Sequence, residues 1–140
     1  MANYWGRARA EQVTPVRTFL DEKLLVAGGT DSPVIPYNPF WAMYHFITRD
    51  TISDGVYGAG QRITREEALR IYTINNARLT FEENIKGSIE PGKLADLVVL
   101  SADFLTVPER AIASIKPLAT MVGGRFVYVA EPDDLGLGRR

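Results

Sequence analysis

Apolar residues at helical spacing predict two helices in the first third of the chain. Thr14-Pro15 places a capping residue before a proline, and apolar side chains then recur at helical spacing to about Asp21. Asn38-Pro39 repeats the capping signal. An apolar stripe at i, i+3, i+4 and i+7 follows it, formed by Phe40, Met43, Tyr44 and Ile47.

A third helix is predicted further along the chain. Thr64 and Glu67 stand three positions apart, which is the spacing of a capping box. The helix is expected to run from Arg65 to about Ala77. It turns one apolar face inward, made of Ala68, Ile71 and Tyr72.

The run Leu24 to Ala27 is apolar without alternation and stops at Gly28-Gly29. A short continuous apolar run is typical of a strand covered on both faces, as in a parallel sheet. We therefore expect a buried strand over Leu24 to Gly28, opening into a loop at Asp31.

The last third of the chain changes character and predicts a small antiparallel sheet. Pro91-Gly92 is a turn signal, and the segment Leu94 to Leu100 is rich in residues that favour strands. Two further β-forming segments, 118–122 and 125–129, flank Gly123-Gly124, a pair suited to a two-residue hairpin turn.

Composition narrows the possible functions. The chain has 140 residues, a length that fits one ordinary domain, and a formal net charge of -1 without a dense basic run, which makes nucleic acid an unexpected partner. No apolar stretch reaches the roughly 20 residues that cross a bilayer, so we expect no membrane association and a cytoplasmic protein. The absence of cysteine excludes disulfides, thiolate nucleophiles and cysteine-based zinc sites.

The chain contains a single histidine, His45. A catalytic zinc site usually takes at least two imidazole ligands, because neutral nitrogen ligands hold the ion without quenching its Lewis acidity. The chain alone cannot supply them.

Four short motifs occur in an order that resembles a known family. They are Gly29 to Val34, Arg62 to Leu69 followed by Tyr72-Thr73 and Ala77, Gly87 to Leu100, and Thr120 to Arg125. Together they closely resemble the C-terminal end of the amidohydrolase superfamily, in the branch of N-substituted amide and formamide hydrolases called amidohydrolase family 3. The resemblance runs from about Thr14 to Tyr128.

The resemblance implies an α/β fold: a C-terminal fragment of a TIM-type (β/α)8 barrel followed by part of a small β-sandwich. Residues 1–80 would hold the last barrel units, residues 81–130 the sandwich segment, and residues 131–140 a flexible tail. The segment Leu24 to Gly28 would be the eighth barrel strand, with Asp31 at its C-terminal mouth, where barrel enzymes place their chemistry.

The resemblance also implies that Asp31 is both a catalytic residue and a metal ligand. In the family the equivalent aspartate touches the metal, takes a proton from the bound water and passes it to the leaving nitrogen. A carboxylate near a cation stays ionised at neutral pH and can act as a base. The alternative is a loop carboxylate that caps the turn at Ser32-Pro33.

Other chemistry-bearing residues are interpreted structurally. His45 lies in a helix beside the apolar stripe and is given no ligand role. Asp96 alternates with apolar residues in a strand and is expected to bond a neighbouring turn. The aromatic residues Tyr37, Phe40, Trp41 and Tyr44 are interpreted as helix packing rather than as a substrate box.

The family also needs histidines and further ligands from earlier strands, which this chain lacks. A divalent metal, by resemblance zinc, is therefore expected only in a complete assembly, and weak or no binding in this chain alone. A second copy, a second chain or the rest of a longer precursor would cover the barrel strand.

Two functions remain open. The chain is either the C-terminal part of a hydrolase of non-peptide carbon–nitrogen bonds, acting on small-molecule amides and inactive alone, or a non-catalytic self-associating module. A serine hydrolase using Ser32 and His45 is disfavoured, because no Gly-x-Ser-x-Gly elbow surrounds any serine.

Overall fold

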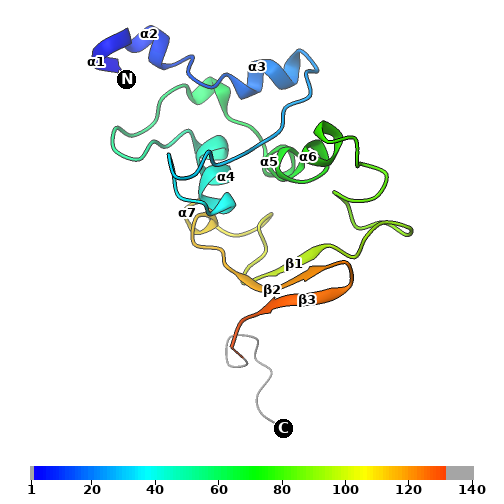
Figure 1. Ribbon diagram of the computed structural model, residues 1–140. Helices are drawn as coiled ribbons and strands as arrows, with labels where there is room; N and C mark the ends of the chain where they lie inside the picture. The colour runs from blue at the N-terminus through cyan, green and yellow to red at the C-terminus, as the bar shows by residue number, and fades with distance from the viewer. Residues whose placement is uncertain (1, 132–140) are drawn as a thin grey trace.

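The chain forms helices and one small antiparallel sheet, an α/β arrangement that the computed structural model describes over residues 2–131. Figure 1 shows most helices towards one end and the sheet at the other, with α7 between them. The elements are, in order, α1 (Ala2–Trp5), α2 (Arg7–Ala10), α3 (Val16–Asp21), α4 (Pro39–Thr48), η1 (Ala59–Gln61), α5 (Arg65–Tyr72), α6 (Ile74–Leu79), β1 (Leu97–Leu100), α7 (Glu109–Ile112), β2 (Pro117–Val122) and β3 (Arg125–Val129).

The hydrophobic core lies among the helices and is centred on α4. Ile71 of α5 is 1% exposed and Ile112 of α7 is fully buried, and both belong to one cluster with Met43 and Ile47 of α4. Phe40 of α4 packs against Phe104, with ring centroids 6.2 Å apart. The predicted apolar stripe of α4 therefore faces the core, as its spacing requires.

Two predicted helix starts, those of α4 and α5, are confirmed by their hydrogen bonds. At α3 the predicted cap at Thr14 is wrong, because the N-cap position is Pro15, which makes no side-chain capping bond. At α4 the side chain of Asn38 accepts from the Phe40 amide at 2.9 Å. At α5 the Thr64 hydroxyl accepts from the Glu67 amide at 3.1 Å, and the Glu67 carboxylate accepts from the Thr64 amide at 2.8 Å. This reciprocal pair is the predicted capping box.

The single helix predicted from Arg65 to about Ala77 is instead two helices that meet at Thr73. Thr73 has φ −125° and ψ −95°, so α5 ends at Tyr72 and α6 begins at Ile74. The Thr73 hydroxyl donates to the Leu69 carbonyl at 2.8 Å. Threonine hydroxyls that bond back to a helix carbonyl bend helices, and a periodic pattern does not record that bend.

The prediction of a strand over Leu24 to Gly28 is wrong for this chain. Residues 24–30 belong to no β ladder, and Leu24 and Leu25 are 55% and 52% exposed. A parallel strand exists only beside a partner strand, and within residues 2–131 no strand pairs with this segment. Its backbone is bonded to α5 and α6 instead.

The sheet matches the predicted hairpin closely. It has three strands in the order β1-β2-β3, all antiparallel, with Val98 opposite Thr120 and Thr120 opposite Tyr128. Gly123 and Gly124 have φ of 56° and 79°, the positive values that a two-residue hairpin turn needs. Strand β1 is shorter than predicted, since it begins at Leu97 rather than Leu94.

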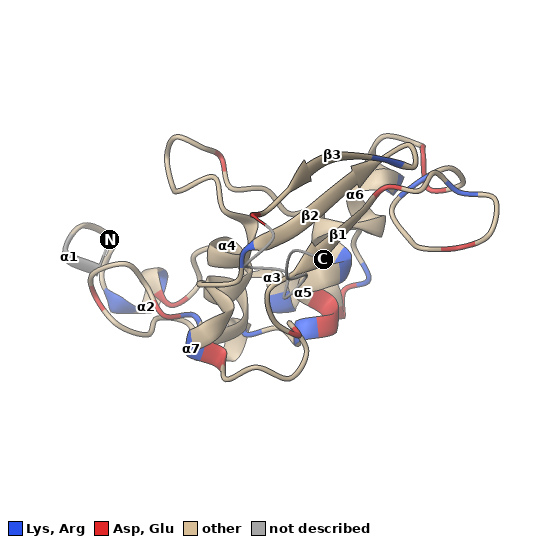
Figure 2. Cartoon of the chain, turned by 90° about the horizontal axis from the view of Figure 1, so that it is seen from below, with Lys and Arg blue, Asp and Glu red and all other residues tan. Residues whose placement is uncertain are grey.

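The sheet contributes little to the core. All five residues of β3 are exposed, including Phe126 at 60% and Val127 at 63%. Figure 2 shows charged residues along the helices and loops, while the strands carry almost none apart from Arg125 at the start of β3. An apolar, uncharged and exposed sheet is a surface that usually meets another surface.

Within the described part of the chain, no helix has the length and apolar character that crossing a membrane requires. The predicted flexible tail, 131–140, lies outside the described residues except for Glu131.

Candidate functional site around Asp31

Asp31 lies at the end of the segment 24–30 with its side chain exposed. Its backbone is in the left-handed region, with φ 51°, and its carbonyl accepts from the Val34 amide at 2.9 Å. The turn is therefore closed by the backbone of Asp31. None of the hydrogen bonds within the described residues involves its carboxylate, so no such bond occupies the carboxylate oxygens. Its catalytic role stays a prediction.

The segment before Asp31 is held by four hydrogen bonds from α5 and α6. The Gly28 amide donates to the Ile71 carbonyl at 2.8 Å. Side chains donate to three carbonyls of the segment: Asn75 to Val26 at 2.9 Å, Asn76 to Gly28 at 3.1 Å, and Tyr72 to Gly29 at 2.9 Å. We call the side chains of Tyr72, Asn75 and Asn76 the clamp.

Sequence reasoning did not assign the clamp. Tyr72 was expected only to pack inward, and the two asparagines were not singled out. One signal was present: consecutive asparagines are weak helix formers, so their place in α6 calls for a reason outside the helix. Burial raises the pKa of Tyr72 to about 12.

A second feature ties α3 to the start of α5. Both carboxylate oxygens of Glu67 accept from Nη1 of Arg17 at 2.8 Å. Burial alone would raise the pKa of Glu67, but hydrogen bonds from Thr64 and Arg17, with the positive charge of Arg17, outweigh burial and lower it. The hydrogen bond to Glu67 raises the pKa of Arg17 in turn.

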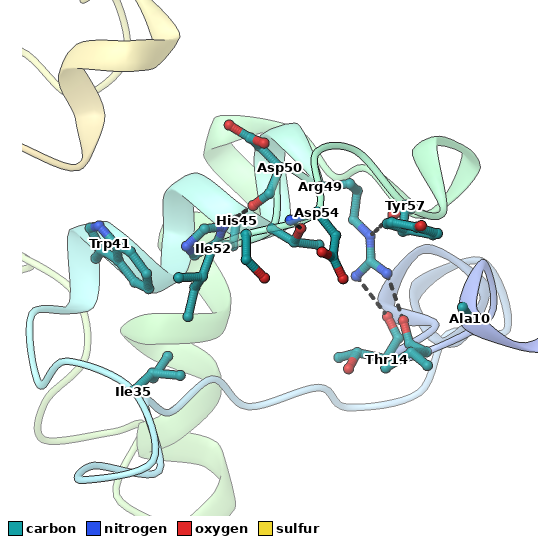
Figure 3. Close-up of a pocket in the computed structure, with 13 residues that line it drawn as sticks. Ala10, Thr14, Ile35, Trp41, His45, Arg49, Asp50, Ile52, Asp54 and Tyr57 are labelled. Atoms are coloured by element: carbon teal, nitrogen blue, oxygen red, sulfur yellow. Dashed lines mark hydrogen bonds between the residues drawn. The ribbon is translucent and has the colours of Figure 1, made fainter. Parts of the chain in front are cut away.

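A cavity of about 430 Å³ lies between α2, α4 and the loop 50–57, and Asp31 is not among its lining residues. Figure 3 shows Trp41, His45 and Ile52 on one side of it and Arg49 with Tyr57 on the other. Arg49 donates to the carbonyls of Val13, Thr14 and Tyr57 at 2.6, 3.2 and 3.1 Å. Burial lowers the pKa of Arg49. Arg49 thus holds three pieces of backbone together and has little left to offer a ligand.

His45 lines this cavity, where its Nδ1 bonds the backbone carbonyl of Asp50. Its Nε2 is buried and has no hydrogen-bond partner within the described residues. The interpretation of His45 as a residue without a ligand role stays a prediction.

The described residues do not provide a metal site. No group of three or more His, Asp or Glu side chains among residues 2–131 is arranged to hold an ion. Asp31 supplies one exposed carboxylate. His45 lines the cavity between α2 and α4, and Asp31 does not line that cavity. Because one carboxylate gives neither the ligand number nor the geometry of a zinc centre, this chain alone does not fit the metal.

Asp96 and the aromatic residues near α4 make contacts within the fold. Asp96 accepts from the Gly123 amide at 2.7 Å, which confirms that it bonds a neighbouring turn. The packing interpretation of the aromatic group is confirmed for Phe40, which is buried, and is wrong for Tyr37, which is 83% exposed. Trp41 lines the cavity beside His45. The Tyr44 hydroxyl donates to the Asp50 carboxylate at 2.7 Å, and this bond raises the pKa of Tyr44.

Several known proteins are similar to this chain over most of its length. An N-substituted formamide deformylase from Arthrobacter pascens is 33% identical over 128 residues, covering 90% of this chain and 24% of that protein. The protein LONG AFTER FAR-RED 3 from Arabidopsis thaliana is 34% identical over 113 residues, covering 80% of this chain and 19% of that protein. The chain spans about a quarter of the length of the first of these relatives.

The structural comparison agrees. The crystal structure of an amidohydrolase from Thermotoga maritima matches with a TM-score of 0.61 and 28% identity, over 81% of this chain and 25% of that one. A sequence model described as the amidohydrolase family matches residues 1–128. The motifs, the relatives and the fold thus agree, and the chain belongs to the amidohydrolase family, in the branch called amidohydrolase family 3.

Proposed function

We propose that this chain is the C-terminal part of a metal-dependent amidohydrolase, which hydrolyses carbon–nitrogen bonds of small amides or formamides, and that Asp31 is its catalytic contribution. The observation that carries the proposal is the carboxylate of Asp31, which is exposed and makes no hydrogen bond within the described residues. Asp31 follows the C-terminal end of the segment 24–30, which α5 and α6 hold in place. Family membership supplies the reaction class.

The proposal extends to the fold of the complete protein. Residues 1–80 are proposed as the last units of a TIM-type barrel and residues 81–130 as part of a composite β-sandwich. The exposed Leu24 and Leu25 and the exposed face of β3 support it, because these apolar surfaces need a cover. The missing strands would come from the remainder of a longer protein, from a second chain or from another copy.

The chemistry assigned to Asp31 is proton transfer. Its carboxylate takes a proton from the attacking water, whose oxygen bonds to the amide carbonyl carbon. The carbon–nitrogen bond then breaks, and the same proton goes to the leaving nitrogen. The products are an amine and a carboxylic acid, which is formic acid when the substrate is a formamide; the acid then releases its proton to water at neutral pH. A divalent metal, by resemblance zinc, would be held by Asp31 together with residues outside this chain.

The test replaces Asp31 in the complete protein that contains this chain. Asp31→Asn keeps the shape of the side chain and removes its basicity, so kcat for N-substituted formamides should fall by about 10³-fold. Formate release measures the rate. Asp54→Asn is the matched control, because Asp54 is another exposed aspartate whose carboxylate makes no hydrogen bond within the described residues. A rate like that of the wild type in Asp31→Asn would contradict the mechanism.

A non-catalytic, self-associating module is the second candidate. The observation in its favour is β3, a sheet edge whose side chains are all exposed and mostly apolar. Light scattering on the purified chain tests it: a monodisperse oligomer free of metal would favour this candidate, whereas a monomer would count against it.

A further inference from the structure

The side chains that hold the backbone before Asp31 come from one helix pair, α5 and α6. In a sheet, the carbonyls of residues 26, 28 and 29 would be satisfied by neighbouring strands, but here three side chains from one helix pair supply the donors. Asn75 is a buried polar residue, 9% exposed, and its Nδ2 reaches the Val26 carbonyl. A buried amide is stable only while it is bonded, so this contact resists opening.

The packing around Gly28 makes the same connection closer. A Cβ built on Gly28 would lie 2.5 Å from Cε2 of Tyr72, nearer than real Cβ contacts come. At Gly29 the same construction meets nothing within 4 Å. The ring of Tyr72 therefore lies flush against the backbone of Gly28, while its hydroxyl bonds the next carbonyl at Gly29.

Few contacts of Asp31 itself fix the position of its side chain. Its side chain is exposed and makes no hydrogen bond within the described residues, and its backbone bond to Val34 leads away from the segment. The last anchored carbonyl, at Gly29, is two residues before it. Its direction is therefore set by whatever holds residues 26–29. Displacing a catalytic group by about 1 Å can cost as much as 10²-fold in rate.

We propose that Tyr72, Asn75 and Asn76 are positioning residues for Asp31, which fix the backbone before it and thereby aim its carboxylate. This inference rests on the proposed function, because it assigns the clamp a role in the same reaction. The break between α5 and α6 at Thr73 belongs to this arrangement. It gives α6 a direction from which Asn75 and Asn76 reach the carbonyls of residues 26 and 28.

The first experiment uses Tyr72→Phe in the complete protein. The variant keeps the ring on Gly28 and removes only the hydroxyl that bonds Gly29. We expect kcat for N-substituted formamides to fall about tenfold with KM unchanged, because the substrate still binds while the base is misdirected. Tyr128→Phe, on the exposed strand β3, is the matched control and should leave both constants as they are.

A double-mutant cycle shows whether the clamp acts through Asp31. In the Asp31→Asn background, Tyr72→Phe should cause no further loss, because there is no base left to aim. A tenfold loss in both backgrounds would overturn the inference, as would a Tyr72→Phe variant with the kcat of the wild type. Asn76→Asp repeats the cycle with Asn84→Asp as its control, since Asn84 is an exposed asparagine beyond α6.

Hydrogen exchange gives a readout that does not depend on activity. In Asn76→Asp and Tyr72→Phe, amide exchange over residues 24–31 should quicken severalfold, while exchange in β2 and β3 stays the same. Unchanged exchange over this segment would overturn the clamp. The outcomes remain separable: an active Asp31→Asn defeats the proposed function, whereas an inactive Asp31→Asn with a fully active Tyr72→Phe defeats the clamp alone.

Discussion

The helical part of this chain and its sheet are stabilised in different ways. The helices α4, α5 and α7 enclose their own apolar side chains, with Ile71 and Ile112 almost wholly out of solvent. The sheet pairs its three strands but leaves Phe126 and Val127 largely exposed. Apolar side chains buried in a core stabilise the folded chain. Apolar side chains on an exposed sheet stabilise it only when another surface covers them. The difference shows that the helical part has a core of its own, although Leu24 and Leu25 in that part are exposed as well.

The largest expected effect contrasts the two regions directly. Ile71→Ala removes a side chain from the core, so the free energy of unfolding should fall by about 2–5 kcal/mol. Phe126→Ala removes a larger side chain from the exposed sheet and should change it by less than about 0.5 kcal/mol. Urea unfolding followed by circular dichroism measures both. A comparable loss in Phe126→Ala would show that the sheet is covered in solution.

An intermediate effect tests whether the segment before Asp31 belongs to the helical part. Gly28→Ala forces a methyl group against the ring of Tyr72 and should cost about 1–3 kcal/mol, the usual cost of overpacking. Gly29→Ala meets open space and should be nearly neutral. Thermal unfolding of the two variants compares them. Equal melting temperatures would mean that the segment is not held against α5.

The smallest effect concerns the tie between α3 and α5. The pKa of Glu67 is lowered in the folded chain, so its ionised form stabilises the fold above the ordinary carboxylate value of about 4.3. That stability is lost as the pH falls through the lowered folded pKa. Glu67→Gln should therefore be less stable than wild type at pH 7, by about 0.5 kcal/mol, and equally stable near pH 2.

The matched control for this prediction is Glu66→Gln. Glu66 stands beside Glu67 in the first turn of α5, is exposed and makes no ion pair within the described residues. Its stability should follow the wild type across the same pH range. Urea midpoints measured from pH 7 to pH 2 give both curves. A constant difference between Glu67→Gln and wild type would show that the charge of Glu67 is not what ties the helices.

Local signals in the sequence were enough for several elements. The caps at Asn38 and Thr64 and the glycine pair at the hairpin act through neighbouring residues, so the sequence alone places them. That Asp96 bonds a neighbouring turn also follows from its apolar neighbours in the sequence, because a carboxylate among them needs a donor. The structure places Asp96 just before β1, where it accepts from the Gly123 amide. Asp31 was singled out by its motif, which the family comparison supports without testing the role of the residue.

The sequence by itself determined the starts of α4 and α5, the hairpin and the family, because each depends on residues close together in the chain or on their order. Only the tertiary structure decided that residues 24–30 form no strand and that Tyr72, Asn75 and Asn76 hold them. A strand needs a partner, and a clamp needs residues more than 40 positions apart to meet. A periodic pattern records neither of these encounters, because both are made in space rather than along the chain.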